Sequence, residues 1–139
     1  MPNKIQLNKS KNERLIPSPR KKVLIVEDDQ DIRESLGFFL ESEGYRVEAA
    51  ENGKEALRLL REASEVPGLV FLDLPMPVMS GEALLAEITQ DAALSALKVP
   101  IVVFTAAARG AVSGPIVSAM KKPVDLDEIL KVVVKYCGA

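Results

Sequence analysis

Four short apolar runs constrain the fold of this chain more than any other feature of its sequence. Runs of four or five residues that are rich in β-branched side chains predict strands buried on both faces. Such strands belong to parallel sheets, which need helices on both sides. Residues 45–50 alternate polar and apolar side chains more than the others, which predicts a strand at the edge of the sheet. The four apolar runs are Val23–Val26, Leu69–Leu72, Ile101–Phe104 and Ile116–Met120.

Amphipathic segments separate these runs. Ile32, Leu36 and Leu40 fall on one helical face. Residues that can cap the start of a helix stand at Asp29, Asn52, Ser80 and Asp125. A last helix is expected after residue 125. Residues 106–115 contain two glycines and a proline, which leaves room for only a short or frayed fourth helix. Strands alternating with helices predict an α/β fold with a doubly wound, five-stranded parallel sheet.

Composition excludes several classes of function. The 139 residues suit one domain, and none of them is histidine. A Ser-His-Asp hydrolase, a Cys-His protease and a histidine-ligated zinc site are therefore excluded. The single cysteine, Cys137, has no internal partner for a disulfide, so a cytoplasmic location is expected. No apolar stretch approaches the roughly 20 residues of a membrane helix, so no membrane is expected as a partner.

The charge of the chain is unevenly distributed. Residues 1–22 carry a net charge of +6, whereas the remaining 117 residues carry −8. Residues 1–20 lack apolar periodicity and contain a Pro-Ser-Pro break, so we expect a solvated, disordered tail. Contact of this basic tail with nucleic acid, with an anionic membrane or with the acidic body stays open.

Polar side chains with a common chemistry follow the predicted strands. Glu27 and Asp28 follow the first strand, Asp73 the third, Thr105 the fourth and Lys122 the fifth. The carboxyl ends of parallel strands meet at one edge of the sheet, so these groups should converge. Taken singly, each has an ordinary role, such as a helix cap, a turn or a surface lysine. Together, three carboxylates with a lysine and a hydroxyl suit Mg²⁺ and the transfer of a phosphoryl group.

The chain resembles the receiver domains of response regulators over residues 21–138. This resemblance implies the flavodoxin-like strand order 2-1-3-4-5. It also implies a signalling protein of two-component or phosphorelay pathways, rather than a classical enzyme. The matching strings are VLIVEDDQDIRESL, NGKEAL, VFLDLPMPVMSG, PIVVFTA and KKPVDLDEIL.

Carried over position by position, the resemblance assigns a role to each site residue. It makes Asp73 the residue that accepts the phosphoryl group, and a ligand of Mg²⁺ with Glu27, Asp28 and the backbone carbonyl of Pro75. Asp28 is the expected direct ligand, and Glu27 is expected to act through water.

The remaining site residues would contact the phosphoryl group. Thr105 becomes the hydroxyl that follows it, and Lys122 becomes the lysine that contacts it. Pro123 matches the proline that follows this lysine in the family.

Three departures from the family pattern affect the expected readout. Ala119 stands where the family usually has an aromatic residue that moves on activation. Only 16 residues separate Thr105 from Lys122, which shortens the fourth helix, and Val124 replaces a frequent phenylalanine. The phosphorylation chemistry is therefore expected to be intact and the readout altered.

The resemblance implies a histidine kinase or a histidine phosphotransfer protein as donor, and a downstream protein as effector of a stand-alone receiver. A homodimer stays open, and DNA is not expected because no helix-turn-helix follows. The alternative is a phosphorylation-independent binding module with the same fold. A phosphatase of the haloacid dehalogenase type needs a second aspartate where Pro75 stands, and the glycine-rich motifs of nucleotide-binding folds are absent.

Overall fold

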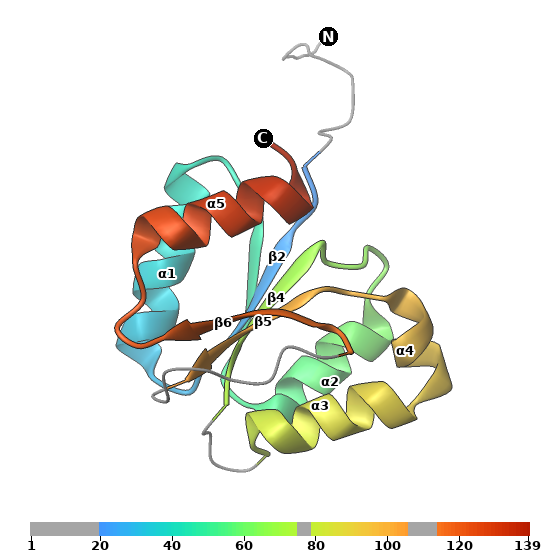
Figure 1. The fold of residues 1–139 in the computed structure, drawn as a ribbon. Helices are drawn as coiled ribbons and strands as arrows, with labels where there is room; N and C mark the ends of the chain where they lie inside the picture. Colours follow the sequence, from blue (N-terminus) through green and yellow to red (C-terminus); the bar gives the residue numbers. More distant parts are fainter. Residues whose placement is uncertain (1–19, 75–78, 106–113) are drawn as a thin grey trace, which may run out of the picture.

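Five parallel strands form the centre of the molecule, and helices cover both faces of their sheet (Figure 1). The computed structural model describes residues 20–74, 79–105 and 114–139. The elements follow in the order β2 (Val23–Val26), α1 (Gln30–Ser42), β3 (Val47–Ala50), α2 (Gly53–Glu62), β4 (Leu69–Asp73), α3 (Gly81–Gln90), α4 (Ala92–Leu97), β5 (Ile101–Thr105), β6 (Ile116–Lys121) and α5 (Leu126–Cys137).

The strand order across the sheet is β3-β2-β4-β5-β6, and every pairing is parallel. Counted along the chain, this is the order 2-1-3-4-5, so the predicted fold class is confirmed. β3 lies at an edge, as its alternating sequence predicts. The remaining strands begin and end within about one residue of the predicted runs, whereas β3 begins at Val47, two residues after the predicted start.

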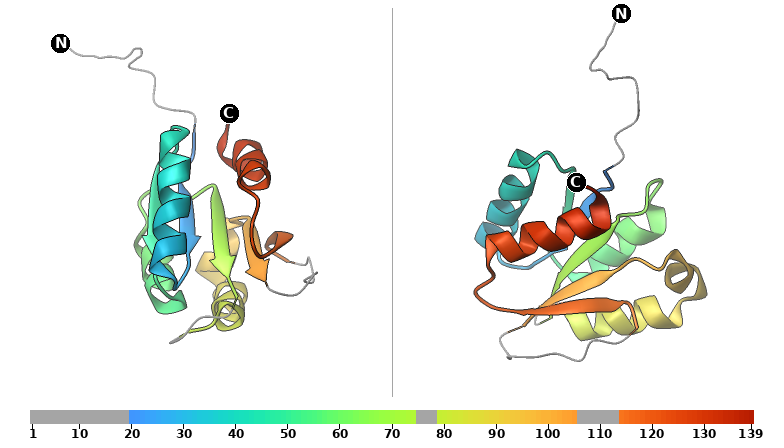
Figure 2. Two further views of the ribbon diagram at one scale, coloured as in Figure 1. Left: turned by 90° about the vertical axis from the view of Figure 1, so that its left-hand side faces the viewer. Right: turned by 45° about the horizontal axis from the view of Figure 1, so that its top comes forward.

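Helices lie on both sides of the sheet (Figure 2). An apolar layer fills the space between the sheet and the helices on each face. One layer lies under α1 and α5, where the rings of Phe71 and Phe104 stack with centroids 5.4 Å apart. The other lies under α2, α3 and α4 and includes Leu57 and Leu84. Alternate residues of each central strand enter opposite layers, which explains why these strands are apolar throughout.

The helix starts depend on side-chain caps at the predicted residues. The side chain of Asp29 accepts a hydrogen bond from the backbone N–H of Ile32 at 3.0 Å, and Asn52 accepts one from Glu55 at 2.8 Å. Asp125 caps α5 in the same manner. These caps satisfy backbone donors of the first turn, which have no partner within the helix.

The connection between α3 and β5 differs from the sequence expectation. It contains α4, a short helix whose N-cap Asp91 accepts hydrogen bonds from the backbone of Ala93 and Leu94 at 2.9 and 3.1 Å. The short fourth helix expected within residues 106–115 falls almost wholly on residues 106–113, which lie outside the described residues. The tail at 1–19 and Pro75 lie outside them too, so those expectations stay predictions.

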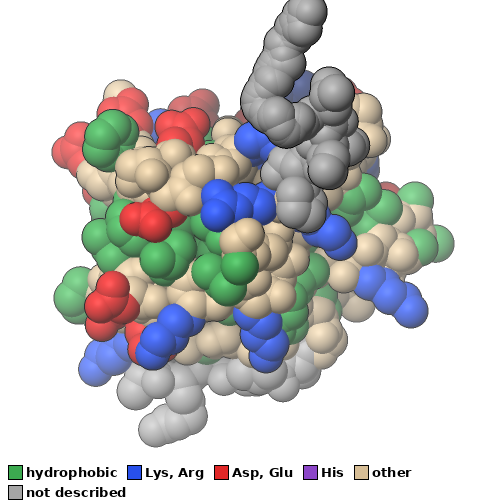
Figure 3. Space-filling model, turned by 90° about the horizontal axis from the view of Figure 1, so that it is seen from above, with side chains coloured by type: hydrophobic (Ala, Val, Ile, Leu, Met, Phe, Trp, Pro, Cys, Tyr) green, Lys and Arg blue, Asp and Glu red, His purple; other side chains and the backbone are tan. Residues whose placement is uncertain are grey.

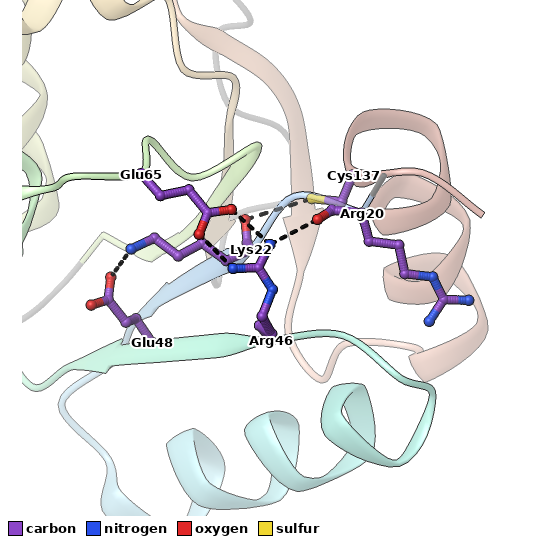
Figure 4. A network of polar contacts seen from close by, with 6 residues as sticks. All are labelled: Arg20, Lys22, Arg46, Glu48, Glu65 and Cys137. Carbon is purple, nitrogen blue, oxygen red and sulfur yellow. Dashed lines mark hydrogen bonds and ion pairs between the residues drawn. The ribbon is translucent and has the colours of Figure 1, made fainter. Parts of the chain in front are cut away.

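The start of the described chain is tied to its end beside β2 (Figure 4). The backbone N–H of Lys21 donates to the carbonyl of Cys137 at 2.9 Å. The guanidinium of Arg46 pairs with Glu65 and also donates to the carbonyl of Arg20 at 2.8 Å. These contacts fix the entry of the chain into the sheet. Within the described ranges, no helix has the length and apolar character that a membrane span requires.

Candidate functional site

Two acidic side chains are buried at the carboxyl edge of the sheet. Asp73 is the last residue of β4 and Glu27 directly follows β2, and each is only 1% exposed. Backbone hydrogen bonds hold both positions. Leu74 donates to the carbonyl of Phe104 at 3.2 Å, and Glu27 donates to that of Ala50 at 3.0 Å. The neighbouring strands β2 and β4 thus bring the two carboxylates together from positions 46 residues apart in the sequence.

Asp28 completes an acidic cluster with these two residues. Glu27, Asp28 and Asp73 each present one carboxylate oxygen, and the three oxygens lie within 4.8 Å of one another. Oε1 of Glu27 and Oδ1 of Asp73 are buried and have no hydrogen-bond partner. The other carboxylate oxygen of Glu27 accepts a hydrogen bond from the backbone of Asp29 at 3.1 Å. Oxygen-only donors with unsatisfied buried atoms fit a hard divalent cation such as Mg²⁺.

Lys122 supplies the positive charge of the site. Its Nζ lies 2.7 Å from Oδ1 of Asp73. The two groups therefore form an ion pair, and the ammonium is the partner of this buried oxygen. The backbone N–H of Lys122 donates to the carbonyl of Thr105 at 3.0 Å. Because of that bond, the residue after β6 and the last residue of β5 stay side by side.

The structure therefore brings Glu27, Asp28, Asp73 and Lys122 into one cluster at the predicted edge. Thr105 stands at the same edge, half-buried at the end of β5 and in register with Lys121 of β6. Pro75, the fourth expected metal ligand, lies outside the described residues.

Two residues near the site carry no sequence signal that singles them out. Nη1 of Arg33 donates to the carbonyl of Glu27 at 2.8 Å and holds the backbone of the acidic segment. Gly81 donates to the carbonyl of Leu74 at 2.6 Å, and a Cβ there would lie 2.8 Å from the carbonyl oxygen of Asp73. Only a residue without a side chain permits this close approach of α3 to the end of β4.

The electrostatics of the site follow from burial and proximity. Burial raises the pKa of Glu27 to about 7, and the nearby charge of Asp73 acts in the same direction. Burial also raises the pKa of Asp73, although Lys122 opposes this effect. Burial alone would lower the pKa of Lys122, but its contact with Asp73 and the charge of Glu27 raise it. The cluster thus has excess negative charge that a bound cation would stabilise.

Residues 23–134 match the family model of the response regulator receiver domain. The chain belongs to the response regulator receiver domain family. Receiver domains are signalling modules of two-component systems, and the buried acidic cluster lies where the sequence motifs of this family predict it.

Individual relatives agree with this assignment. The chain is 38% identical over 122 residues to the uncharacterized 14.6 kDa protein in the sodA1 3′ region of Leptolyngbya boryana, which covers 84% of this chain and 90% of that protein. It is 36% identical over 116 residues to the response regulator MprA of Mycolicibacterium vanbaalenii, which covers 78% of this chain. The match spans 47% of MprA, about half of its length.

A solved structure shows the same fold. The response regulator TrrA of Thermotoga maritima, determined in complex with Mg²⁺ and BeF, has a TM-score of 0.70 and 33% identity to this chain. The match covers 84% of this chain and 98% of TrrA.

Proposed function

We propose that this receiver domain accepts a phosphoryl group on Asp73 from a phosphohistidine of a histidine kinase or a histidine phosphotransfer protein. One observation carries the proposal. The buried carboxylate of Asp73 lies 2.7 Å from an ammonium group and within 4.8 Å of oxygens from two further acidic residues. Carboxylates that repel one another around buried Asp73 and half-buried Lys122 have little structural value, but they suit a site that holds a cation and a phosphate.

The chain's own groups account for the transfer step. A carboxylate oxygen of Asp73 attacks phosphorus, and an O–P bond forms as the P–N bond of the donor histidine breaks. The electron pair of that bond stays on the donor nitrogen. The ammonium of Lys122 and the hydroxyl of Thr105 stabilise the negative charge on the transferring group.

A divalent cation is part of this proposal. Glu27, Asp28 and Asp73 would hold Mg²⁺, which supplies charge compensation for the phosphoryl oxygens. The buried Oε1 of Glu27, which has no hydrogen-bond partner, supports this assignment.

We further propose that the phosphorylated state is read by a partner protein at the face formed by β5, β6 and α5. Lys122 directly follows β6, and the β5–β6 ladder runs from the site along the edge of the sheet. A change in the Lys122 contact with Asp73 therefore acts directly on the end of β6. Ala119 lies within β6, half-buried, so the conformational readout operates without an aromatic side chain at that position.

A phosphodonor assay tests the assignment of Asp73. Incubation with acetyl phosphate and Mg²⁺ should add the mass of one phosphoryl group to the wild-type protein, and chelation of Mg²⁺ should abolish the gain. Asp73→Asn should show none. Asp91→Asn is the matched control, because Asp91 caps α4 away from the site. Equal labelling of wild type and Asp73→Asn, or none in either, would instead support the phosphorylation-independent binding module.

A further inference from the structure

A cavity lies at the amino edge of the sheet, at the opposite end of the strands from Asp73. Its volume is about 700 Å³. Leu94 of α4 and Ile88 of α3 form one wall, and Val117 of β6 and Tyr136 of α5 form another. Pro100, directly before β5, also lines it. This volume lies within the usual range for sites that bind small molecules.

Two lysines line this apolar cavity. Lys21 comes from the segment before β2, and Lys98 from the end of α4. Among the described residues, neither has an ion-pair partner, whereas the nearby Lys22 and Arg46 are paired with Glu48 and Glu65. Seen from this end, basic side chains lie at several places on the surface, including its middle and right, whereas acidic ones gather on the left (Figure 3).

The backbone at Lys98 supports a role for its side chain. Lys98 ends α4 in the left-handed conformation, with φ of 53°. Glycine or asparagine adopts this conformation at lower cost, so a lysine there is unusual. Strained residues of this kind are concentrated at ligand sites. The conformation places a charged side chain where the end of α4 lines the cavity.

We propose that this cavity binds a small carboxylic acid with an apolar body. The apolar walls would bury the body, and Lys21 and Lys98 would pair with the carboxylate. This site is separate from Asp73, and the proposal does not depend on phosphorylation.

Charge argues against two other occupants of the cavity. Residues 1–19 contain four Lys or Arg and a single Glu, so the lysines would repel the chain's own tail. A second copy docked through the same face would add two further lysines to the same interface. An anionic ligand is the one that complements the cavity.

Titration with decanoate, followed by amide shifts in ¹⁵N NMR spectra, tests the proposal. Saturable shifts are expected at Gly68, Ile88 and Tyr136, with affinity of about millimolar for a ligand of this size. Decanol and decylammonium test the charge preference, and both should bind at least about threefold more weakly. Acetyl phosphate labelling of Asp73 should be unchanged, so the two sites are judged separately.

The matched variants are Lys21→Gln with Lys98→Asn, and Lys54→Gln as control. Asparagine tolerates the left-handed backbone at residue 98, and Lys54 lies in the first turn of α2, away from the cavity. The double variant should weaken decanoate binding about three- to tenfold, and the control should leave it unchanged. Shifts outside the cavity, equal affinity for decanol, or full affinity in the double variant would overturn the proposal. Shifts that depend on protein concentration without ligand would assign the cavity to a second copy and also overturn it.

Discussion

Glu27 and Asp73 are the residues at which stability and function conflict. Both carboxylates are buried and close together, and burial raises the pKa of each. An ionised carboxylate in such a position destabilises the folded chain unless a cation compensates its charge. Lys122 compensates for the charge of one of these carboxylates, and the remaining negative charge suits the site to a further cation.

This conflict predicts how stability depends on pH in the absence of metal. The pKa of Glu27 is about 7 in the folded chain, against an ordinary value of 4.5. The folded state therefore binds more protons between these values, and its stability falls as pH rises from about 4.5 to about 7. Glu27→Gln should remove much of this fall and raise the free energy of unfolding at pH 8 by about 1–3 kcal/mol.

Urea unfolding at pH 5 and pH 8, with a chelator present, measures both effects. Glu48→Gln is the control, because Glu48 lies at the surface in an ion pair with Lys22. A pH dependence identical in wild type and Glu27→Gln would contradict the account of the buried carboxylate.

At this scale the sequence predicts which residues meet, but not their environment. Glu27, Asp73 and Lys122 follow apolar runs, and the parallel sheet brings run ends together, so their convergence could be predicted. Their burial, the 2.7 Å ion pair and the buried Glu27 oxygen without a hydrogen-bond partner depend on packing that no local pattern encodes. Arg33 and Gly81 were missed because a single arginine or glycine in a helix has many ordinary explanations.

At the scale of the elements, single capping side chains determine where several helices begin, and a glycine determines how closely α3 packs against β4. The caps at Asp29, Asn52 and Ser80 were predictable, because a capping residue and the helix it starts are neighbours in the sequence. The six-residue α4 was not, since AALSAL is too short for a helical periodicity to stand out. Its Leu94 is buried against the layer under α2 and α3, so tertiary packing stabilises this helix.

The packing around two glycines predicts opposite effects of alanine substitution on stability. A Cβ at Gly81 would lie 2.6 Å from the Cα of Leu74, so Gly81→Ala must displace α3 or the end of β4. It should lower the free energy of unfolding by about 1–3 kcal/mol and slow the phosphorylation of Asp73.

Gly37→Ala is the comparison. Gly37 lies inside α1, and an added Cβ there would meet only side chains of other elements, at 3.7 Å or more. It should raise stability by about 0.5–1 kcal/mol. Thermal unfolding of the two variants separates these outcomes. A Gly81→Ala protein as stable and as readily phosphorylated as wild type would show that α3 does not position Asp73.

At the scale of the whole molecule, the single sheet joins two apolar layers, and α5 ends beside the first described residues. The hydroxyl of Tyr45 donates to the carbonyl of Gly138 at 2.5 Å, and Lys21 bonds to Cys137. Cys137 is buried in the layer under α1 and α5. Opening this region therefore requires α5 to leave the sheet.

This closure predicts that Cys137 reacts only when the molecule opens. Burial raises the pKa of its thiol to about 11, so little thiolate is present at pH 8. Alkylation by iodoacetamide should be at least about a thousandfold slower in the folded protein than in the unfolded chain. Glu41→Cys in a Cys137→Ala background is the exposed control on α1 and should react rapidly. A folded-state rate for Cys137 within tenfold of the unfolded rate would mean that α5 opens far more easily than this packing allows.

The central claim is that Asp73, Glu27, Asp28, Thr105 and Lys122 form one phosphate- and metal-binding site. Magnesium-dependent binding of beryllofluoride, a phosphoryl mimic, followed by ¹⁵N NMR, tests it most directly. The account predicts saturable shifts at the carboxyl edge of the sheet and along β5 and β6, which disappear in Asp73→Asn or without Mg²⁺. Spectra of the wild-type protein that stay unchanged when Mg²⁺ and beryllofluoride are added, or shifts that persist in Asp73→Asn, would contradict it.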